Sequence, residues 1–308
     1  MTDVRPVLVT GAHRSGTGWV GSMIAASPRP PVAYLWEPFS VLHRPGICRA
    51  RFPYWFPYVC VENEAPYLAP ITDMLAFRYG TLAELRSARS VKDAARLIRD
   101  RRSFHRYRAQ GARPLLKDPV AVFSAEWLSD TYGMDVLVLI RHPAAFANSV
   151  KTRRLRHPFG DFLAQPLLMR DLLSSFGEEI QGFTGRERPL LDQGILLWKL
   201  IHHAIAEFRR RRPEWLFLRL EDLARDPMTQ FEDIYFRLGQ ELDGRARATI
   251  LEHSRSTNAA ESPDPADHRR DSRASIETWK TRLTGEEIEK IRREVEPLSK
   301  EFYSDADW

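Results

Sequence analysis

Two glycines and an arginine near the N-terminus have the types and the spacing to hold an anion. Residues 7–10 are mostly apolar and lead into Gly11, and four residues then separate Gly11 from Gly16. Thr17 begins a stretch that can be helical. In a turn between a strand and a helix, glycines let the backbone direct its N–H groups inward, and the helix N-terminus adds positive potential. With Arg14 inside the turn, the segment predicts a cradle for a phosphate or a sulfate, and a tight turn with incidental glycines is the alternative.

The same segment has the glycine spacing of a nucleotide-binding P-loop but lacks the residues that bind its metal. Thr17 stands where that loop has lysine, and Gly18 stands where it has the Ser or Thr that binds Mg²⁺. The cation is instead Arg14, within the loop. We therefore expect the loop to bind an anion without a metal ion, and we assign no metal ligand.

Arg141 and Ser149 form a second pair that could bind a phosphate. Residues 136–140 are an unbroken apolar run, as in buried parallel strands, and Pro143 opens the helix that follows Arg141. P-loop enzymes often have an aspartate that holds Mg²⁺ at the end of such a strand. An arginine fork and a serine hydroxyl just over two helical turns later can hold one phosphate. Taken singly, Arg141 is typical of an arginine that forms an ion pair at the end of a strand, and Ser149 is typical of a serine on a helix surface.

Strands that alternate with helices would bring these residues to one edge of a sheet. Such alternation is typical of a doubly wound parallel sheet, in which ligands bind beyond the carboxyl ends of the strands. We expect an α/β fold, P-loop NTPase-like, with about five strands and extra helices, forming a single domain over residues 1–308. The predicted strands are 7–10, 32–35, 113–117, 136–140 and 215–220. Their ends carry Arg14, Glu37, Lys117, Arg141 and Glu221.

Helical patterning fills most of the chain between these strands. Residues 254–275 are polar and predict a long loop, and a capping box at Thr284 and Glu287 predicts a final helix that ends near residue 302. The other predicted helices are 17–26, 71–77, 82–86, 91–108, 119–132, one from 143, 161–176, 190–212, 228–238 and 246–253.

Composition limits the class of protein and of partner. The chain has 308 residues, a net charge of +5 and a pI near 9.3, which suits an anionic ligand. Cys48 and Cys60 are too few for a disulfide framework. The sequence contains no recognisable signal peptide, no apolar run long enough to span a bilayer, and no basic block interleaved with aromatic residues. We expect a cytoplasmic protein with no transmembrane segment and no nucleic-acid partner, whose oligomeric state stays open.

These segments together resemble the sulfotransferases that use 3′-phosphoadenosine 5′-phosphosulfate (PAPS). The pattern is closest to bacterial and carbohydrate O-sulfotransferases, and it extends from residue 7 to about 295. The loop that binds the 5′-phosphosulfate in that family is similar to Arg14, Ser15, Gly16, Thr17, Gly18 and Trp19. Its 3′-phosphate motif is similar to Arg141, Pro143 and Ser149. The family also has a late loop that carries cations and precedes a tryptophan, and this loop is similar to the segment that contains Arg273, Ser275, Trp279 and Lys280. Gly18 departs from the hydroxyl residue that the family usually has.

The resemblance implies the reaction and the roles of the site residues. The sulfuryl group of PAPS would move to an acceptor hydroxyl, leaving adenosine 3′,5′-bisphosphate (PAP), with no metal. Arg14, Lys117 and the backbone N–H groups of residues 15–17 would stabilise the leaving phosphate. Glu37, followed by proline as in members that act on sugars, would be the general base, with His13 and Asp118 as alternatives. The acceptor would be a glycan, a glycolipid or a small molecule.

Two other classes of protein are kept as alternatives. One is a Mg²⁺-dependent P-loop kinase, and the other is a non-catalytic protein that binds a nucleotide or a polyanion. An aromatic loop over residues 52–58 could line an acceptor site, with Trp55 the residue left open, or it could be a satellite hydrophobic cluster.

Overall fold

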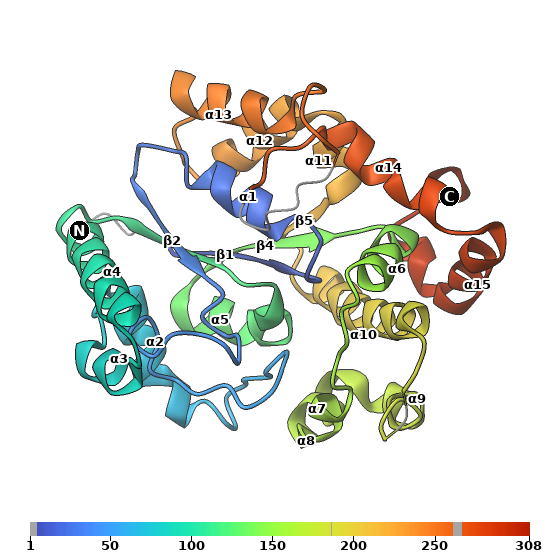
Figure 1. The fold of residues 1–308 in the computed structure, drawn as a ribbon, viewed down its shortest axis with the longest axis horizontal. Helices are drawn as coiled ribbons and strands as arrows, with labels where there is room; N and C mark the ends of the chain where they lie inside the picture. The colour runs from blue at the N-terminus through green and yellow to red at the C-terminus, as the bar shows by residue number, and fades with distance from the viewer. Residues whose placement is uncertain (1–4, 186, 261–266) are drawn as a thin grey trace.

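A parallel sheet lies at the centre of the computed structural model, which describes residues 5–185, 187–260 and 267–308. Its five strands lie in the order β2-β3-β1-β4-β5, and every neighbouring pair is parallel (Figure 1). The strands are β1 (Val7–Gly11), β2 (Val32–Trp36), β3 (Arg113–Lys117), β4 (Asp135–Ile140) and β5 (Leu216–Arg219). The predicted α/β fold is therefore confirmed, and each strand begins and ends within one residue of its predicted bounds.

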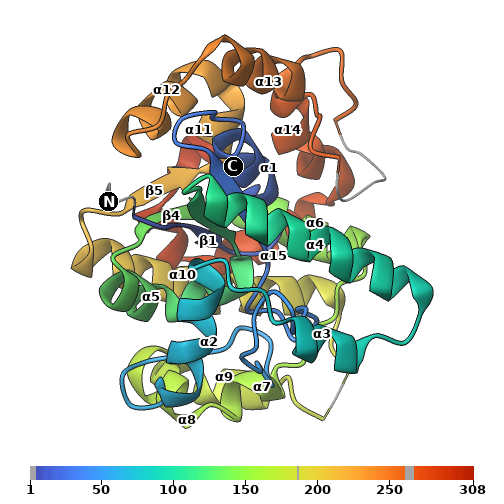
Figure 2. The ribbon, with the colours of Figure 1, turned by 90° about the vertical axis from the view of Figure 1, so that its left-hand side faces the viewer.

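Helices cover both faces of the sheet, which lies between them in the two perpendicular views (Figures 1 and 2). One face packs against α1 (Thr17–Ile24), α11 (Leu220–Arg225), α12 (Pro227–Arg237) and α13 (Gly244–Ser254). The core on the other face takes side chains from α2 (Ala65–Leu75), α4 (Val91–Ala109), η1 (Pro119–Ser124), α5 (Ala125–Tyr132), α6 (Pro143–Thr152) and α10 (Leu190–Arg211).

Shorter elements surround these two layers. They are α3 (Thr81–Ser87), α7 (Gly160–Leu163), α8 (Pro166–Leu168), η2 (Met169–Leu173), η3 (Ser174–Phe176), α9 (Gly177–Gln181), α14 (Ser272–Arg282), α15 (Gly285–Val295), η4 (Leu298–Glu301) and η5 (Asp305–Asp307).

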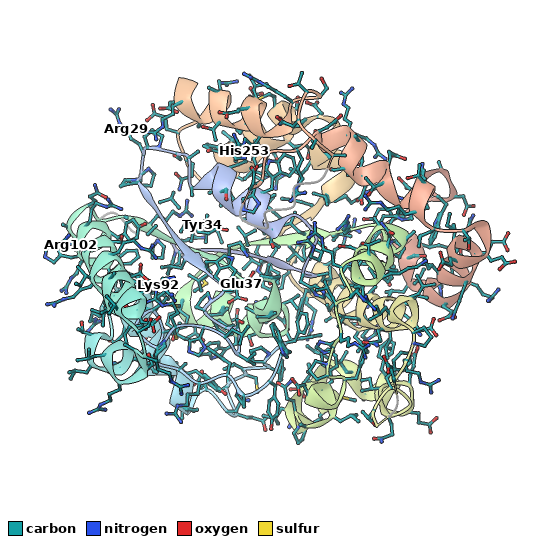
Figure 3. The ribbon with its side chains drawn as sticks, viewed as in Figure 1. Arg29, Tyr34, Glu37, Lys92, Arg102 and His253 are labelled. Atoms are coloured by element: carbon teal, nitrogen blue, oxygen red, sulfur yellow. The ribbon has the colours of Figure 1, made fainter. Side chains whose placement is uncertain are left out.

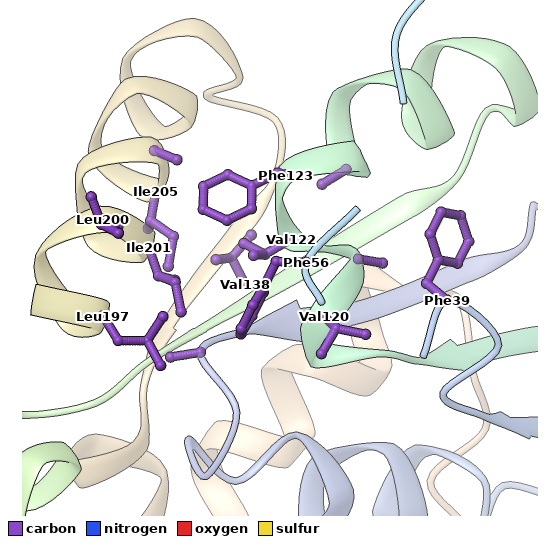
Figure 4. Close-up of a cluster of buried hydrophobic side chains, with 14 of the residues drawn as sticks. Phe39, Phe56, Val120, Val122, Phe123, Val138, Leu197, Leu200, Ile201 and Ile205 are labelled. Atoms are coloured by element: carbon purple, nitrogen blue, oxygen red, sulfur yellow. The ribbon is translucent and has the colours of Figure 1, made fainter. Parts of the chain in front are cut away.

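Alternate residues of β1 point into different cores because successive side chains of a strand face opposite sides of the sheet. Val7 and Val9 pack with α1 and α12, whereas Leu8 packs with the larger core on the other face. That larger core gathers aromatic and branched side chains from η1, α10 and the loop after β2 (Figure 4). With both faces covered, the sheet is rigid and its carboxyl edge can hold side chains in fixed positions.

Several helix boundaries differ from the prediction. α14 begins inside the segment expected to be a loop, because the Asp271 carboxylate caps it by accepting the N–H of Ala274 (3.0 Å). The predicted helix 161–176 is divided into short pieces, one of which starts at Pro166. α11 is also unpredicted. Residues 261–266 of the predicted loop lie outside the described residues.

The final helix begins as the sequence predicts. Thr284 and Glu287 form the expected capping box, in which the Thr284 N–H donates to Glu287 Oε2 (3.1 Å) and the Glu287 N–H donates to Thr284 Oγ1 (3.2 Å). The helix ends at Val295, earlier than expected, and Pro297 precedes the separate turn η4. No helix in the described part of the chain combines the length and the apolar character needed to cross a membrane.

Candidate functional site

A cavity of about 740 Å³ opens at the carboxyl edge of the sheet. Its walls come from the loop after β1, the start of α1, the ends of β2 and β3, Arg141 after β4, and Ser149 of α6. The remaining side is closed by side chains from the C-terminal part of the chain, namely His253, Ala260, His268, Arg270, Ser272 and Ser275. Parallel strands bring these distant segments together because all their carboxyl ends meet at one edge.

Positive charge dominates the described lining of this cavity. Four Lys and Arg side chains line it, namely Arg14, Lys117, Arg141 and Arg270, whereas the described lining has a single carboxylate, that of Glu37. An excess of three positive charges in a partly enclosed space favours a ligand with several negative charges.

Arg14 and Arg141 lie in direct contact, as the prediction of a shared anion site requires. The Arg141 guanidinium donates to the backbone carbonyl of Arg14, and Arg14 Nε donates to Ser149 Oγ (3.3 Å). The indole of Trp198 donates to the Arg141 carbonyl (2.8 Å), which fixes the end of β4 against α10. The three predicted phosphate ligands therefore form one connected group.

The N-terminus of α1 faces the same cavity. Gly16 has a left-handed backbone (φ 84°). The first hydrogen bond of the helix runs from the N–H of Val20 to the carbonyl of Gly16 (3.0 Å). The N–H groups before Val20 have no acceptor within the helix, and Thr17, Gly18 and Trp19 line the cavity. This end of α1 therefore offers backbone donors to an anion.

Glu37 and Lys117 form an ion pair at the end of β2 and β3. Lys117 Nζ donates to Glu37 Oε1 and lies 5.2 Å from the centre of the Trp36 ring. Glu37 and Arg14 both have positive φ angles, 45° and 66°, which side-chain-bearing residues adopt at a cost. The fold thus holds both residues in conformations that aim their side chains at the cavity edge.

The two alternative bases occupy different environments. Asp118 is fully buried, and its carboxylate accepts the N–H groups of Phe39 (2.6 Å) and Val120 (3.1 Å). Burial raises the pKa of Asp118 to about 7. Because both oxygens bind backbone N–H groups, Asp118 positions the chain after Glu37 rather than facing the cavity.

His13 does line the cavity, but its ring packs edge-on against Phe146 (5.2 Å between ring centres). Burial, reinforced by Arg14 and Arg141, lowers the pKa of His13 to about 4. The imidazole of His13 is therefore uncharged at neutral pH.

Two residues predicted to bind the nucleotide lie away from the described cavity lining. Arg273 lies in the first turn of α14 and donates to the carbonyl of Arg225 (3.1 and 2.8 Å). Ser15 is buried beneath the loop, where its N–H donates to the Ala12 carbonyl (3.2 Å). Ser275, by contrast, is part of the lining. Arg273 contacts Arg225 because Asp271 caps the first turn of α14, the helix on which Arg273 lies.

Several cavity residues were not predicted from the sequence, among them His253, His268 and Arg270, whose ionisable side chains could contact an anion. His268 lies over Gly18, where an added Cβ would be 2.7 Å from its Cε1 atom. Burial, with Lys117 and Arg270 nearby, lowers the pKa of His268 to about 4. The small residue at position 18 was visible in the sequence, but its histidine partner, 250 residues away, was not.

The aromatic loop after β2 is mainly a core element. Phe52 stacks on Phe39 (4.4 Å between ring centres), and Phe56 is fully buried. The N–H of Trp55 donates to Asp161 Oδ2 (2.9 Å). None of the described residues 52–58 is among those that line the cavity, so the structure favours the hydrophobic-cluster alternative over an acceptor wall.

Trp19 forms part of the cavity wall and of the core beneath it. Its ring packs edge-on against Phe231 of α12 (5.4 Å between ring centres).

The described residues contain no group of three or more His, Cys, Asp or Glu side chains placed to hold a metal ion.

Comparisons with known proteins return structures but no sequence relatives. The sequence matches no known family and no curated protein. Solved structures that match include the sulfotransferase domain of the Synechococcus PCC 7002 olefin synthase, at 14% identity over 94% of this chain and 93% of that one, with a TM-score of 0.45. Sulfotransferase STF1 from Mycobacterium tuberculosis H37Rv matches at 18% identity over 91% of this chain and 77% of that one, with a TM-score of 0.40.

A mouse sulfotransferase in complex with PAP, SULT7A1, matches at 12% identity over 100% of this chain and 88% of that one, with a TM-score of 0.44. These are likenesses of fold at low identity.

Proposed function

We propose that this chain is a PAPS-dependent O-sulfotransferase, which moves the sulfuryl group of PAPS to an acceptor hydroxyl. The observation that carries the proposal is the joined pair Arg14 and Arg141 on the wall of a cationic cavity, next to the Glu37–Lys117 ion pair. The site thus has separate groups for binding a polyanion and for accepting a proton.

The two ends of the nucleotide would bind different parts of the cavity. The backbone donors of residues 16–19, with Arg14 and Lys117, would hold the 5′-phosphosulfate. Arg141 and Ser149 would hold the 3′-phosphate, because a guanidinium fork and a hydroxyl can share one phosphate group. Arg270 lines the same cavity and would add a further cation.

The proposed chemistry is an in-line displacement at sulfur. Glu37 would take the proton of the acceptor hydroxyl as the new O–S bond forms. The bond between sulfur and the bridging phosphate oxygen breaks, and its electron pair stays on the phosphate. Arg14, Lys117 and the α1 N-terminus would stabilise the charge that develops there.

The Glu37–Lys117 ion pair gives this chemistry an order. While Lys117 is bound to Glu37, the ammonium group occupies a carboxylate oxygen that would otherwise be free to accept the proton. A phosphate that binds Lys117 competes with Glu37 for the ammonium group. Nucleotide binding would therefore release Glu37 for the acceptor, so that the base becomes active after the nucleotide has bound.

We propose a hydroxyl of a glycan or glycolipid as the acceptor. The support is the Glu37-Pro38 pair, which resembles members of the family that act on sugars. A cavity of about 740 Å³ is within the size range of sites that enclose small ligands.

Transfer of labelled sulfate from PAPS to a panel of sugar and glycolipid hydroxyls, with EDTA present, tests the proposal. We expect label on at least one acceptor and release of PAP. Transfer of phosphate from ATP that needs Mg²⁺ would support the kinase alternative instead. Tight binding of PAP with no transfer to any acceptor, in the wild-type protein and after Glu37→Gln alike, would support a non-catalytic binding protein.

A further inference from the structure

The net positive charge of the chain is concentrated on α3 and α4. The chain has 46 Lys and Arg against 41 Asp and Glu, and residues 81–109 alone contain nine of the former and three of the latter. The rest of the chain is therefore close to neutral. The cavity cations lie outside this segment, so nucleotide binding does not account for its charge.

α4 packs against the protein through one narrow stripe. Leu97 and Phe104, seven residues apart, are buried, and Asp93 and Asp100 are half-buried on the same side. A spacing of three and four residues keeps such positions on one face of a helix. The remaining circumference of α4 is exposed to solvent.

The opposite face of α4 has an aliphatic stripe bordered by cations. Val91, Ala95 and Ile98 recur at four- and three-residue spacing on the exposed side, where Val91 is 87% and Ile98 51% exposed. The cation Arg102 follows four residues after Ile98 on the same side. Figure 3 shows Arg102 at the outer surface of the fold. An exposed apolar stripe on an arginine-rich helix is typical of helices that lie on a membrane surface.

α3 extends the same surface. Leu82 and Leu85 are exposed on this helix, at 70% and 59%. Among the described residues, Lys92 and Arg101 of α4 have no acidic partner, so their charge is available to a binding partner. An exposed apolar residue does not by itself indicate a docking surface. Phe236 of α12 is 84% exposed, but the surrounding residues 227–255 contain more acidic than basic residues, unlike α3 and α4.

This surface is tied to the segment that carries the proposed base. Arg44, seven residues after Glu37, forms ion pairs with Glu84 of α3 and Asp100 of α4. The N–H of Gly46 also donates to Glu84 (2.8 Å). In Figure 2, α3 and α4 lie side by side at the front of the view, with α4 running across the outside of the fold. The exposed face therefore has a fixed position relative to the cavity edge.

We propose that α3 and α4 form a peripheral docking surface for membranes that contain anionic lipids. Cations without acidic partners would bind the lipid headgroups, and the aliphatic stripe would enter the interfacial region. The outer side of a helix is convex, which suits a fluid surface better than it suits an extended acidic peptide. The aliphatic residues would add nothing to the binding of a soluble polyanion.

Co-sedimentation of the full chain with vesicles tests this proposal without nucleotide or acceptor, so its failure is independent of the proposed reaction. We expect binding to vesicles of phosphatidylcholine with phosphatidylserine, weak binding to phosphatidylcholine alone, and loss of binding at high salt. The triple variant Lys92→Gln, Arg101→Gln, Arg102→Gln should lower the partition coefficient roughly tenfold or more, since each cation near an anionic surface contributes measurably.

A matched control removes the same charge elsewhere. Arg245→Gln, Arg255→Gln and Arg293→Gln together replace three exposed cations outside α3 and α4, and this variant should bind vesicles as the wild type does. Unchanged thermal unfolding of both triple variants separates lost binding from lost folding. Equal losses in the two variants would overturn the proposal, because net charge alone would then explain binding.

The aliphatic stripe separates a membrane from a soluble acidic partner. Val91→Ser with Ile98→Ser should weaken vesicle binding several-fold and leave binding to polyglutamate unchanged. Wild-type protein that binds polyglutamate but no vesicle would overturn the proposal in favour of an acidic protein partner. Equal wild-type binding to both kinds of vesicle would overturn it as well.

Discussion

The amino group of Lys117 contacts both the carboxylate of Glu37 and the face of the Trp36 ring, in a cavity whose other described Lys and Arg residues are Arg14, Arg141 and Arg270. A bound phosphate and Glu37 are therefore competitors for one ammonium group. Removing the charge of Glu37 should have opposite effects on binding and on transfer.

Replacement of Glu37 by glutamine should lower sulfuryl transfer by about 10²–10⁴-fold, the usual contribution of a general base. The affinity for PAP should stay the same or rise, because the phosphate no longer has to compete with a charged Glu37 for the ammonium group of Lys117. Calorimetry and labelled-sulfate transfer measure the two quantities. Glu214→Gln, an exposed site far from the cavity, is the control, and transfer by Glu37→Gln at the wild-type rate would remove Glu37 as the base.

The pair formed by Gly18 and His268 links the start of α1 to the segment before α14. Because an added Cβ at position 18 would lie 2.7 Å from the imidazole, only glycine fits there while His268 keeps its place. A hydroxyl residue at position 18, as the resembling family usually has, is incompatible with this histidine position.

Gly18→Ala should weaken PAP binding several-fold, because the added methyl group must displace the imidazole of His268 from its place over the start of α1. The double variant Gly18→Ala, His268→Ala should recover part of that loss, and the non-additivity measured by calorimetry reports the contact. Losses that simply add would show that His268 does not occupy the space above Gly18.

At the scale of elements, α14 places Ser272 and Ser275 on the cavity wall because Asp271 caps its first turn. The equivalent cap on α13 is Asp243, whose carboxylate accepts the N–H of Ala246 (2.8 Å). The two caps are chemically alike, but α14 contributes more residues to the cavity.

Asp271→Ala should lower the free energy of unfolding by about 1 kcal/mol, as the loss of a helix cap does, and should also weaken PAP binding. Asp243→Ala should have a similar effect on stability with a smaller one on binding. Chemical denaturation and calorimetry on both variants measure this. Wild-type PAP affinity in Asp271→Ala would contradict the role given to α14.

Element positions were predictable where a local signal was strong. All five strands follow from apolar runs bounded by turn residues, and the capping box at Thr284 predicts the start of α15. α14 was missed because its sequence is polar and its cap, a single aspartate after Pro263 and Pro265, resembles loop composition. Local composition cannot reveal that Trp279 stacks on His142 (4.9 Å between ring centres).

The site was predictable at strand ends and unpredictable elsewhere. Arg14, Glu37, Lys117 and Arg141 follow strands, so the topology of a parallel sheet brings them together. The approach of His253, His268 and Arg270 to the cavity depends on how α13 and α14 pack, which no local pattern encodes. The buried, structural role of Asp118 likewise depends on two N–H groups that the sequence does not bring together.

At the scale of the whole molecule, five histidines are held in the neutral form by burial. Burial lowers the pKa to about 4 for His13 and His268, and to about 3 for His142, His157 and His202. An unfolded histidine has a pKa near 6.5. The unfolded chain therefore binds more protons than the folded chain between these values.

The free energy of unfolding should consequently fall as the pH drops from about 6.5 towards about 4. Asp118 and Glu221 act in the opposite direction, because burial raises the pKa of each carboxyl and protonation then favours the folded state, but they are two groups against five. We expect a loss of about 3 kcal/mol or more by pH 4.5, measured by urea denaturation across this range. A stability that is constant or rising as the pH falls would contradict the buried imidazoles.

The central claim is that arginine side chains and backbone donors bind a nucleotide with separate 3′ and 5′ anionic groups and without a metal ion. Calorimetry of PAP against ADP, both in EDTA, measures this most directly. We expect PAP to bind at least about tenfold more tightly than ADP, since a charge-assisted phosphate contact contributes about 1.5–3 kcal/mol. Arg141→Gln should remove most of that preference. Binding of ADP as tight as that of PAP, or nucleotide binding that appears only when Mg²⁺ is added, would contradict the account.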